Sequence, residues 1–172
     1  MKLEVNKLTN ATVWADGKNY FGKIEEVNLP VPKYKMATHK ALGLIAEIEY
    51  FSGLEKLDMK LKLNAPYKDY MQYMGDPTKK VNLMLRGSLQ NYQGSSIVSE
   101  TPYVVTMVIS PKDYPLGNFK QNENVELENN FTVYYVKLEI SGQKMYEVDV
   151  ENNILFAGGR DVLAAYRANL GL

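Results

Sequence analysis

Hydrophobic and polar positions alternate with a period of two along most of this chain, which is the pattern of strands with one buried face. The clearest case is residues 57–63, where leucine and methionine fall on one face and lysine and aspartate fall on the other. β-Branched and aromatic residues, which favour strands, are abundant in these segments. The pattern therefore predicts a mainly β fold of antiparallel strands, arranged as a β-barrel or sandwich.

Glycine, proline and serine divide the alternating pattern into successive strands. Residues 8–15 and 20–29 flank an Asp16-Gly17 pair, which favours a tight turn, so we predict an opening hairpin. A loop is expected around Gly94, within the stretch of residues 91–102. Further extended segments are predicted at residues 33–40, 46–51, 80–91, 103–112, 125–140 and 144–150.

Two segments change to helical spacing. The first lies between Pro66 and Gly75 and predicts a short helix that flanks the sheet. The second predicts a C-terminal helix with Asp161 in its first turn, Arg167 near its end and Gly171 just beyond it. The apolar stripe of this helix is expected to consist of Val162, Leu163, Tyr166 and Leu170.

The composition fits one globular unit. With 172 residues, 45% of them hydrophobic, the chain can bury a sizeable core, and no repeat or low-complexity linker divides it, so residues 1–172 are expected to form a single domain. Twenty Lys+Arg balance twenty Asp+Glu, so a dedicated nucleic-acid binder with a cationic surface is not expected. No apolar run approaches 18 residues, and we expect no membrane insertion by this chain.

The residues that carry most enzyme chemistry are scarce. Cysteine is absent, which excludes thiolate metal sites and thiol nucleophiles, and His39 is the only histidine, interpreted as a surface residue. Phosphate-binding glycine loops and the Gly-x-Ser-x-Gly motif are also missing. We therefore expect no cofactor, no metal and no catalytic residues. An enzyme with a site made only of carboxylates is the least favoured alternative.

Carboxylates instead mark polar strand faces. Glu47 and Glu49 share one face of a predicted strand, and Glu126 and Glu128 share a face of another, each pair about 7 Å apart by strand rise. The segment 125–140 is much longer than a usual strand of about 5–6 residues. If several copies contributed long strands to one closed sheet, free edges would vanish and a polar face would line an aqueous channel. A monomeric sandwich with a long surface hairpin is the alternative.

Short motifs in a fixed order resemble one known family. The most specific are at the C-terminal end: Gly159-Arg160-Asp161-Val162-Leu163, Arg167 and Leu170-Gly171-Leu172. Earlier motifs are Leu8-Thr9-Asn10, Asp16-Gly17, Phe21-Gly22, Val27-Asn28-Leu29-Pro30, Leu54-Glu55-Lys56-Leu57, Arg86-Gly87-Ser88, Tyr134-Tyr135-Val136-Lys137-Leu138-Glu139 and Tyr146-Glu147-Val148-Asp149. Together they resemble the major tail tube proteins of contractile-tailed bacteriophages and of R-type bacteriocins. The chain departs from that pattern in a longer connection at residues 91–102 and in Val108-Ile109, where relatives often carry Arg-Gly.

The resemblance implies a β-barrel or sandwich subunit that forms hexameric rings, with long strands of all copies joining a multi-subunit inner barrel. The rings would stack into a hollow tube for DNA delivery, as part of a virion tail assembled in the host bacterial cytoplasm. The implied partners are the tail sheath protein, baseplate and tail terminator proteins, a tape measure protein in the lumen during assembly, and DNA in transient, non-specific passage. An R-type bacteriocin or other injection particle, through which no genome passes, is an open alternative, as is a monomeric ligand-binding β-barrel.

Under this resemblance an acidic lumen would repel phosphates and let DNA slide. The lumen-lining candidates are Glu47, Glu49, Glu126, Glu128, Asn130 and Thr132. The alternative places for these residues are the outer surface and the contact between rings, because periodicity identifies a face but not what that face meets. A loop at residues 35–46 is expected to reach the adjacent ring, and its ring-stacking candidates are Leu42, Leu44 and Ile45.

Overall fold

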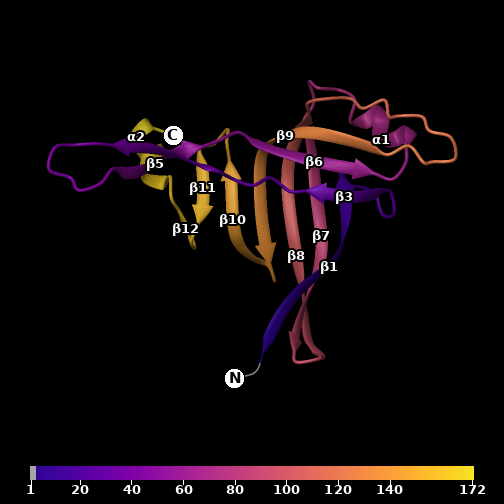
Figure 1. Ribbon diagram of the computed structural model, residues 1–172, viewed down its shortest axis with the longest axis horizontal. Coiled ribbons are helices and arrows are strands. Elements are labelled where there is room, and N and C mark those ends of the chain that lie inside the picture. The colour runs from indigo at the N-terminus through magenta and orange to yellow at the C-terminus, as the bar shows by residue number, and fades with distance from the viewer. Residues whose placement is uncertain (1–2) are drawn as a thin grey trace.

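The computed structural model describes residues 3–172 as two crossed layers of antiparallel strands with two short helices (Figure 1). The strands are β1 (Glu4–Ala15), β2 (Lys18–Asn19), β3 (Ile24–Asn28), β4 (Tyr34–His39), β5 (Ile48–Leu54), β6 (Leu57–Leu63), β7 (Val81–Gln93), β8 (Ser96–Pro111), β9 (Leu127–Ile140), β10 (Gln143–Asp149), β11 (Ile154–Ala157) and β12 (Arg160–Asp161). The helices are α1 (Lys68–Tyr73) and α2 (Ala164–Leu170). The predicted antiparallel, mainly β fold is confirmed. Its sheets stay open in the single chain, so it is a sandwich rather than a closed barrel.

The larger layer contains the longest strands. Its order is β12-β11-β10-β9-β8-β7-β1-β2, and we call β1, β7, β8, β10 and the second half of β9 the long-strand layer. In Figure 1 these strands run down the picture, while β3, β6 and the start of β9 run across them. We call this second group the crossed layer.

Strand β9 belongs to both layers because it bends near Tyr134. Residues 127–133 pair with β6, whereas residues 135–140 pair with β10, and β8 pairs along the opposite edge from residue 131 onward. Tyr134 is the extra residue of a bulge in this pairing, and its carbonyl accepts a hydrogen bond from the Val150 amide at 3.0 Å. Bulges bend strands and increase their twist, so this one lets a single strand pass from one layer to the other.

The core fills the space between the layers. Strand β6 points Leu57, Met59, Leu61 and Leu63 inward and its lysines outward, as the alternation predicts. They belong to one buried cluster with inward side chains of β7, β8 and β9, among them Leu83, Met107, Ile109 and Phe131. The predicted flanking helix is confirmed as α1, which contributes buried Tyr70 and, just after its last turn, Met74. Apolar burial of this kind is the main force that holds the two layers together.

A buried polar chain lies beneath α1. The Tyr70 hydroxyl donates a hydrogen bond to the Asn129 side-chain oxygen at 3.2 Å, and the Asn129 amide donates to the Asp113 carbonyl at 3.0 Å. Burial raises the pKa of Tyr70 well above its ordinary value. The neighbouring Tyr20 ring packs edge-on against Tyr70 at 5.9 Å, but the Tyr20 hydroxyl has no hydrogen-bond partner within the described residues.

The predicted opening hairpin is only partly correct. Asp16 and Gly17 adopt positive φ angles of 41° and 80°, as a tight turn requires. The returning strand β2 is only two residues long, however, and β3 turns away to pair with β6. The reason is packing, since Ile24 and Val27 on β3 contact the core between the layers.

The loop predicted around Gly94 is confirmed, but as a turn of two residues and not as a longer connection through residues 91–102. Strands β7 and β8 continue their pairing as far as Gln93 and Ser96, so only a two-residue turn remains. The polar, serine-rich composition suggested a loop, but here it belongs to two exposed strands. Neither helix in residues 3–172 is long and apolar enough to cross a membrane.

Candidate assembly surfaces

Four of the six lumen candidates lie together on the outer side of the crossed layer. Glu128, Asn130 and Thr132 alternate along β9 with buried residues, and Glu126 immediately precedes this strand. Two neighbouring lysines of β6 neutralise the acids: Lys60 lies 2.9 Å from Glu128, and Lys62 lies 2.8 Å from Glu126. We call the surface formed by residues 58, 60, 62, 126, 128, 130 and 132 the ladder face.

The remaining groups of the ladder face are also paired. The Asp113 carboxylate accepts hydrogen bonds from the Asn130 backbone amide at 3.0 Å and from the Asn130 side-chain amide at 2.5 Å, and Thr132 lies opposite Asp58 in the strand pairing. Lys112 lies 2.6 Å from Asp58, and its hydrogen bond holds the pKa of that carboxyl below its ordinary value. The ladder face therefore alternates positive and negative charge and is not a purely acidic surface.

Glu47 and Glu49 lie elsewhere, on a projection that we call the hairpin, formed by β4, β5 and the loop at residues 40–47. The hairpin is a separate two-stranded sheet, and Figure 1 shows β5 and the adjoining loop extending to one side of the molecule. Glu49 lies within β5, whereas Glu47 immediately precedes this strand and forms an ion pair with Lys40 in the loop.

The hairpin exposes apolar side chains. Leu42 and Ile45 at its tip are fully exposed, and Leu44 is 44% exposed. Other large exposed side chains continue the patch along its strands: Tyr34, Met36, Ile48, Tyr50 and Phe51. The predicted apolar character of this loop is confirmed, and an exposed apolar patch of this extent is typical of a contact surface.

A second polar surface was missed by the sequence reasoning. Along β7 and β8 the inward residues are buried, while the intervening ones, such as Arg86 and Thr106, face the side away from the crossed layer. Strand pairing places Thr12 beside Arg86, and Lys137 beside Thr106. We call this side of the long-strand layer the open face. The same alternation that identified the ladder face was present in residues 81–86 and could have revealed it.

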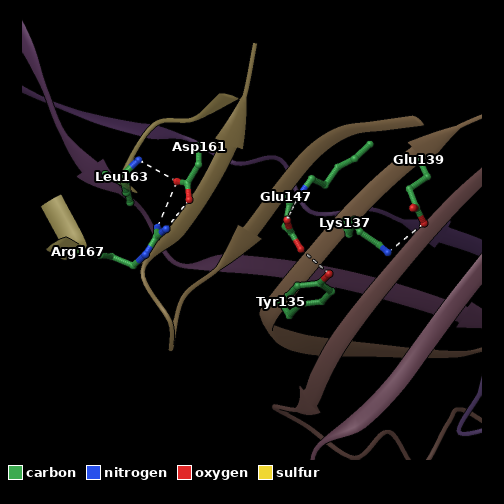
Figure 2. A network of polar contacts seen from close by, with 8 residues as sticks. Tyr135, Lys137, Glu139, Glu147, Asp161, Leu163 and Arg167 are labelled. Atoms are coloured by element: carbon green, nitrogen blue, oxygen red, sulfur yellow. Dashed lines mark hydrogen bonds and ion pairs between the residues drawn. The ribbon is translucent and has the colours of Figure 1, made fainter. Parts of the chain in front are cut away.

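Lysines and glutamates of β9 and β10 form local pairs on the open face (Figure 2). Lys137 lies 3.1 Å from Glu139, and Lys144 lies 2.6 Å from Glu147. The Tyr135 hydroxyl also donates to Glu147 at 2.7 Å. Partial burial alone would raise the pKa of Glu147, but the hydrogen bonds from Lys144 and Tyr135 hold it below its ordinary value.

The C-terminal helix is shorter than predicted. Asp161 lies in β12 rather than in the first helical turn, and its carboxylate accepts hydrogen bonds from the Leu163 amide at 3.1 Å and from Arg167 at 3.2 Å (Figure 2). Gly171 ends α2 in the left-handed conformation, as expected. Most of the predicted apolar stripe is exposed, and only Leu163 packs against the core. Because few apolar side chains of α2 pack against the core, the contact between Asp161 and Arg167 is what attaches α2 to β12.

Comparison with known proteins identifies the family of this chain. Residues 5–171 match the model of the family described as phage tail tube protein FII. The chain belongs to this family. The match covers the long-strand layer, the crossed layer, the hairpin and α2, and so identifies a phage tail tube subunit.

Individual relatives agree with the FII family membership. The tail tube protein of Escherichia phage P2 is 27% identical over 172 residues, which cover 96% of this chain and 97% of that protein. A chain of an extracellular contractile injection system, in a structure described as a PVC sheath-tube complex in the extended state, shares the fold with a TM-score of 0.54 and 12% identity. That likeness covers 75% of this chain and 87% of the other. A sheath/tube terminator structure of the same system matches equally well, over 75% of this chain and 92% of that chain.

Proposed function

We propose that this tail tube subunit assembles as hexameric rings, which stack into a hollow conduit inside a contractile sheath and deliver DNA. The observation that carries the proposal is the family match over residues 5–171, in a chain whose longest strands form one open sheet. The related structures are described as a sheath-tube complex and a sheath/tube terminator, which supports a sheath and a terminator as partners here. The protein acts by assembly, and no catalytic, metal or cofactor site is part of the proposal.

Open strand edges support closure between copies. The outer edge of β1 pairs with β2 only at Trp14 and Ala15, so residues 4–12 have no strand partner on that side within the described chain. Unpaired edges favour addition of another strand. A ring in which each copy supplies both a left and a right edge closes without leaving either edge exposed.

The open face is our choice for the channel wall. It belongs to the layer with the longest strands, so closing that layer around an axis gives a continuous wall. Its lysines and glutamates are paired, which limits attraction for phosphate during the passage of DNA. The ladder face then takes the alternative position noted for its residues, on the outer surface or between subunits. The prediction that Glu126, Glu128, Asn130 and Thr132 line the lumen competes directly with this assignment.

The hairpin is proposed to reach the adjacent ring. Its tip presents Leu42, Leu44 and Ile45, and covering these apolar side chains would favour stacking. A tape measure protein would occupy the channel during assembly in the host cytoplasm, with the baseplate at one end and the terminator at the other. If the particle is an R-type bacteriocin or another injection system, the same tube forms and no genome passes.

The first experiment is negative-stain electron microscopy of the purified protein across a concentration series, with light scattering to measure mass. Hollow tubes, or rings with the mass of a hexamer, are the expected result. If the protein remains monomeric at all concentrations, baseplate components are added to nucleate growth. Failure to form rings or tubes under both conditions overturns the assembly proposal.

A further inference from the structure

A three-stranded projection extends beyond the core of the molecule. It consists of residues 4–8 of β1, 89–93 of β7 and 96–101 of β8, and we call it the arm. Figure 1 shows it leaving the sheet at the end opposite α1, with the N-terminus beside it. None of the buried core residues belongs to the arm, so packing against the rest of its own chain does not support it. An isolated ribbon of this kind is only marginally stable in water.

Both outer edges of the arm are unpaired. Strand β9 begins to pair with β8 only at Tyr103, so residues 96–101 have no neighbour on that side in the described chain. On the other side, residues 4–8 of β1 pair with β7 alone. The arm thus presents two open edges, and both β1 and β8 run antiparallel to β7, so they are parallel to each other.

The two edges carry opposite charges at the same level. Lys7 on β1 pairs across the sheet with Gln90 on β7, which in turn pairs with Glu100 on β8. Cross-strand partners lie on the same face, so the three side chains form one row. The Gln90 amide donates to the Glu100 carboxylate at 2.9 Å, and Ser88 donates to it at 3.2 Å. No ion pair within residues 3–172 includes Lys7 or Glu100.

We infer that the arm binds a second copy of this chain, with the β1 edge of one copy along the β8 edge of the next and Lys7 paired with Glu100 across the contact. This inference rests on the proposed ring assembly and specifies one of its contacts. Because each copy has one edge of each kind, a rotationally symmetric ring joins every Lys7 to a Glu100 and leaves no arm edge exposed. The parallel direction of β1 and β8 within one copy is kept between copies related by rotation about the tube axis, which allows a parallel strand pairing.

Charge exchange tests this contact. Lys7→Glu alone places a second carboxylate against Glu100 at each contact, and Glu100→Lys alone places a second ammonium group against Lys7. We expect each variant to raise the protein concentration needed for assembly at least about tenfold at low salt, with partial recovery at high salt. In an equimolar mixture the two variants can alternate around a hexamer, which joins opposite charges at every contact. Half of these contacts then carry the native Lys7–Glu100 pair and half carry the exchanged pair, so the mixture should assemble at concentrations close to the wild type. The double variant Lys7→Glu/Glu100→Lys joins opposite charges at every contact and should assemble at concentrations close to the wild type.

The control is Lys68→Glu, the same charge reversal at an exposed lysine of α1, which lies far from the arm in Figure 1. It should assemble like the wild type. If both single arm variants assemble like the wild type, or if both fail and the double variant does not recover, the arm contact is overturned while tube formation by the wild type stands. If the wild type itself forms no rings or tubes with baseplate components present, it is the proposed function that fails.

Discussion

Glu128 on β9 and Lys60 on β6 lie 2.9 Å apart across two adjacent strands, although they are not direct partners in the pairing. Lys62 is the direct partner of Glu128, but it contacts Glu126 instead, so each lysine reaches one step along β9. This diagonal pattern neutralises the two acids that the sequence suggested as lumen residues. Charge on a strand face therefore depends on the neighbouring strand as much as on the strand itself.

Charge reversal separates the two candidate channel walls. We expect Glu139→Lys on the open face to permit tube assembly but slow DNA release severalfold, because it frees Lys137 and adds a cation where DNA passes. The double variant Glu126→Lys/Glu128→Lys on the ladder face should release DNA at the normal rate from any tubes it forms. DNA release from particles that carry each variant is the measurement. The reverse outcome would favour the lumen assignment of Glu126 and Glu128.

Polar substitutions at the hairpin tip should block stacking. Leu42→Asp with Leu44→Asp is expected to leave folded monomers or single rings, because these side chains are exposed and do not support the core. Sedimentation and electron microscopy measure the product. Leu116→Asp, a change at another exposed leucine in a different loop, is the matched control and should leave tubes unchanged. Tubes of normal length from the double variant would show that the tip does not join the rings.

Tyr70 in α1 and Tyr20, which packs against it, should respond differently to loss of the hydroxyl group. Tyr70→Phe removes the donor to Asn129 and leaves a buried amide oxygen without that partner, which should lower the free energy of unfolding by about 1–2 kcal/mol. Tyr20→Phe removes a hydroxyl that has no partner in the described chain, so stability should stay the same or rise. Denaturant unfolding of the two variants and the wild type gives the comparison. Equal losses in both would contradict the hydrogen-bond assignment.

Gly87 accommodates the irregularity of β1 between Leu8 and Ala11, at the base of the arm. A Cβ atom there would lie 2.9 Å from the Asn10 carbonyl oxygen and 2.9 Å from a methyl group of Leu8. Backbone cannot yield as a flexible side chain can, so Gly87→Ala should lower the free energy of unfolding by roughly 1–3 kcal/mol. Hydrogen exchange of residues 4–8 should also become faster as β1 separates from β7. Unchanged protection in this segment would be inconsistent with the close approach of β1 to Gly87.

Protonation of Asp161 at low pH should weaken the attachment of α2 to β12. The Arg167 hydrogen bond lowers the pKa of Asp161 in the folded protein, so this carboxylate stabilises the fold fully above its ordinary pKa of about 4. That contribution is lost as the pH falls through the lowered folded value. The protection of α2 against hydrogen exchange, relative to the intrinsic rate at each pH, should therefore fall in this acidic range, while Asp161→Asn should show reduced protection already at neutral pH. Identical pH profiles for the variant and the wild type would exclude this attachment.

Local pattern was sufficient for much of the secondary structure. The alternation in residues 57–63 predicted β6 and its buried face, and the apolar spacing between Pro66 and Gly75 predicted α1. The Asp16-Gly17 turn follows from two of the few residues that tolerate positive φ. These features depend on neighbours close in sequence. The prediction that the protein forms a tube came from the family resemblance, because the pattern of a single strand cannot specify an assembly.

The sequence by itself determined the strand class, the faces of the strands, the helix that flanks the sheet and the family. Only the tertiary structure decided that β3 leaves β2 for β6, that β9 serves two layers, and that the acids at 126 and 128 face lysines. The physical reason is that period two assigns a residue to a side of its own strand, whereas pairing between distant strands decides which charges and apolar groups meet there. The arm likewise required the register of β1, β7 and β8 before Lys7 and Glu100 could be placed at its two edges.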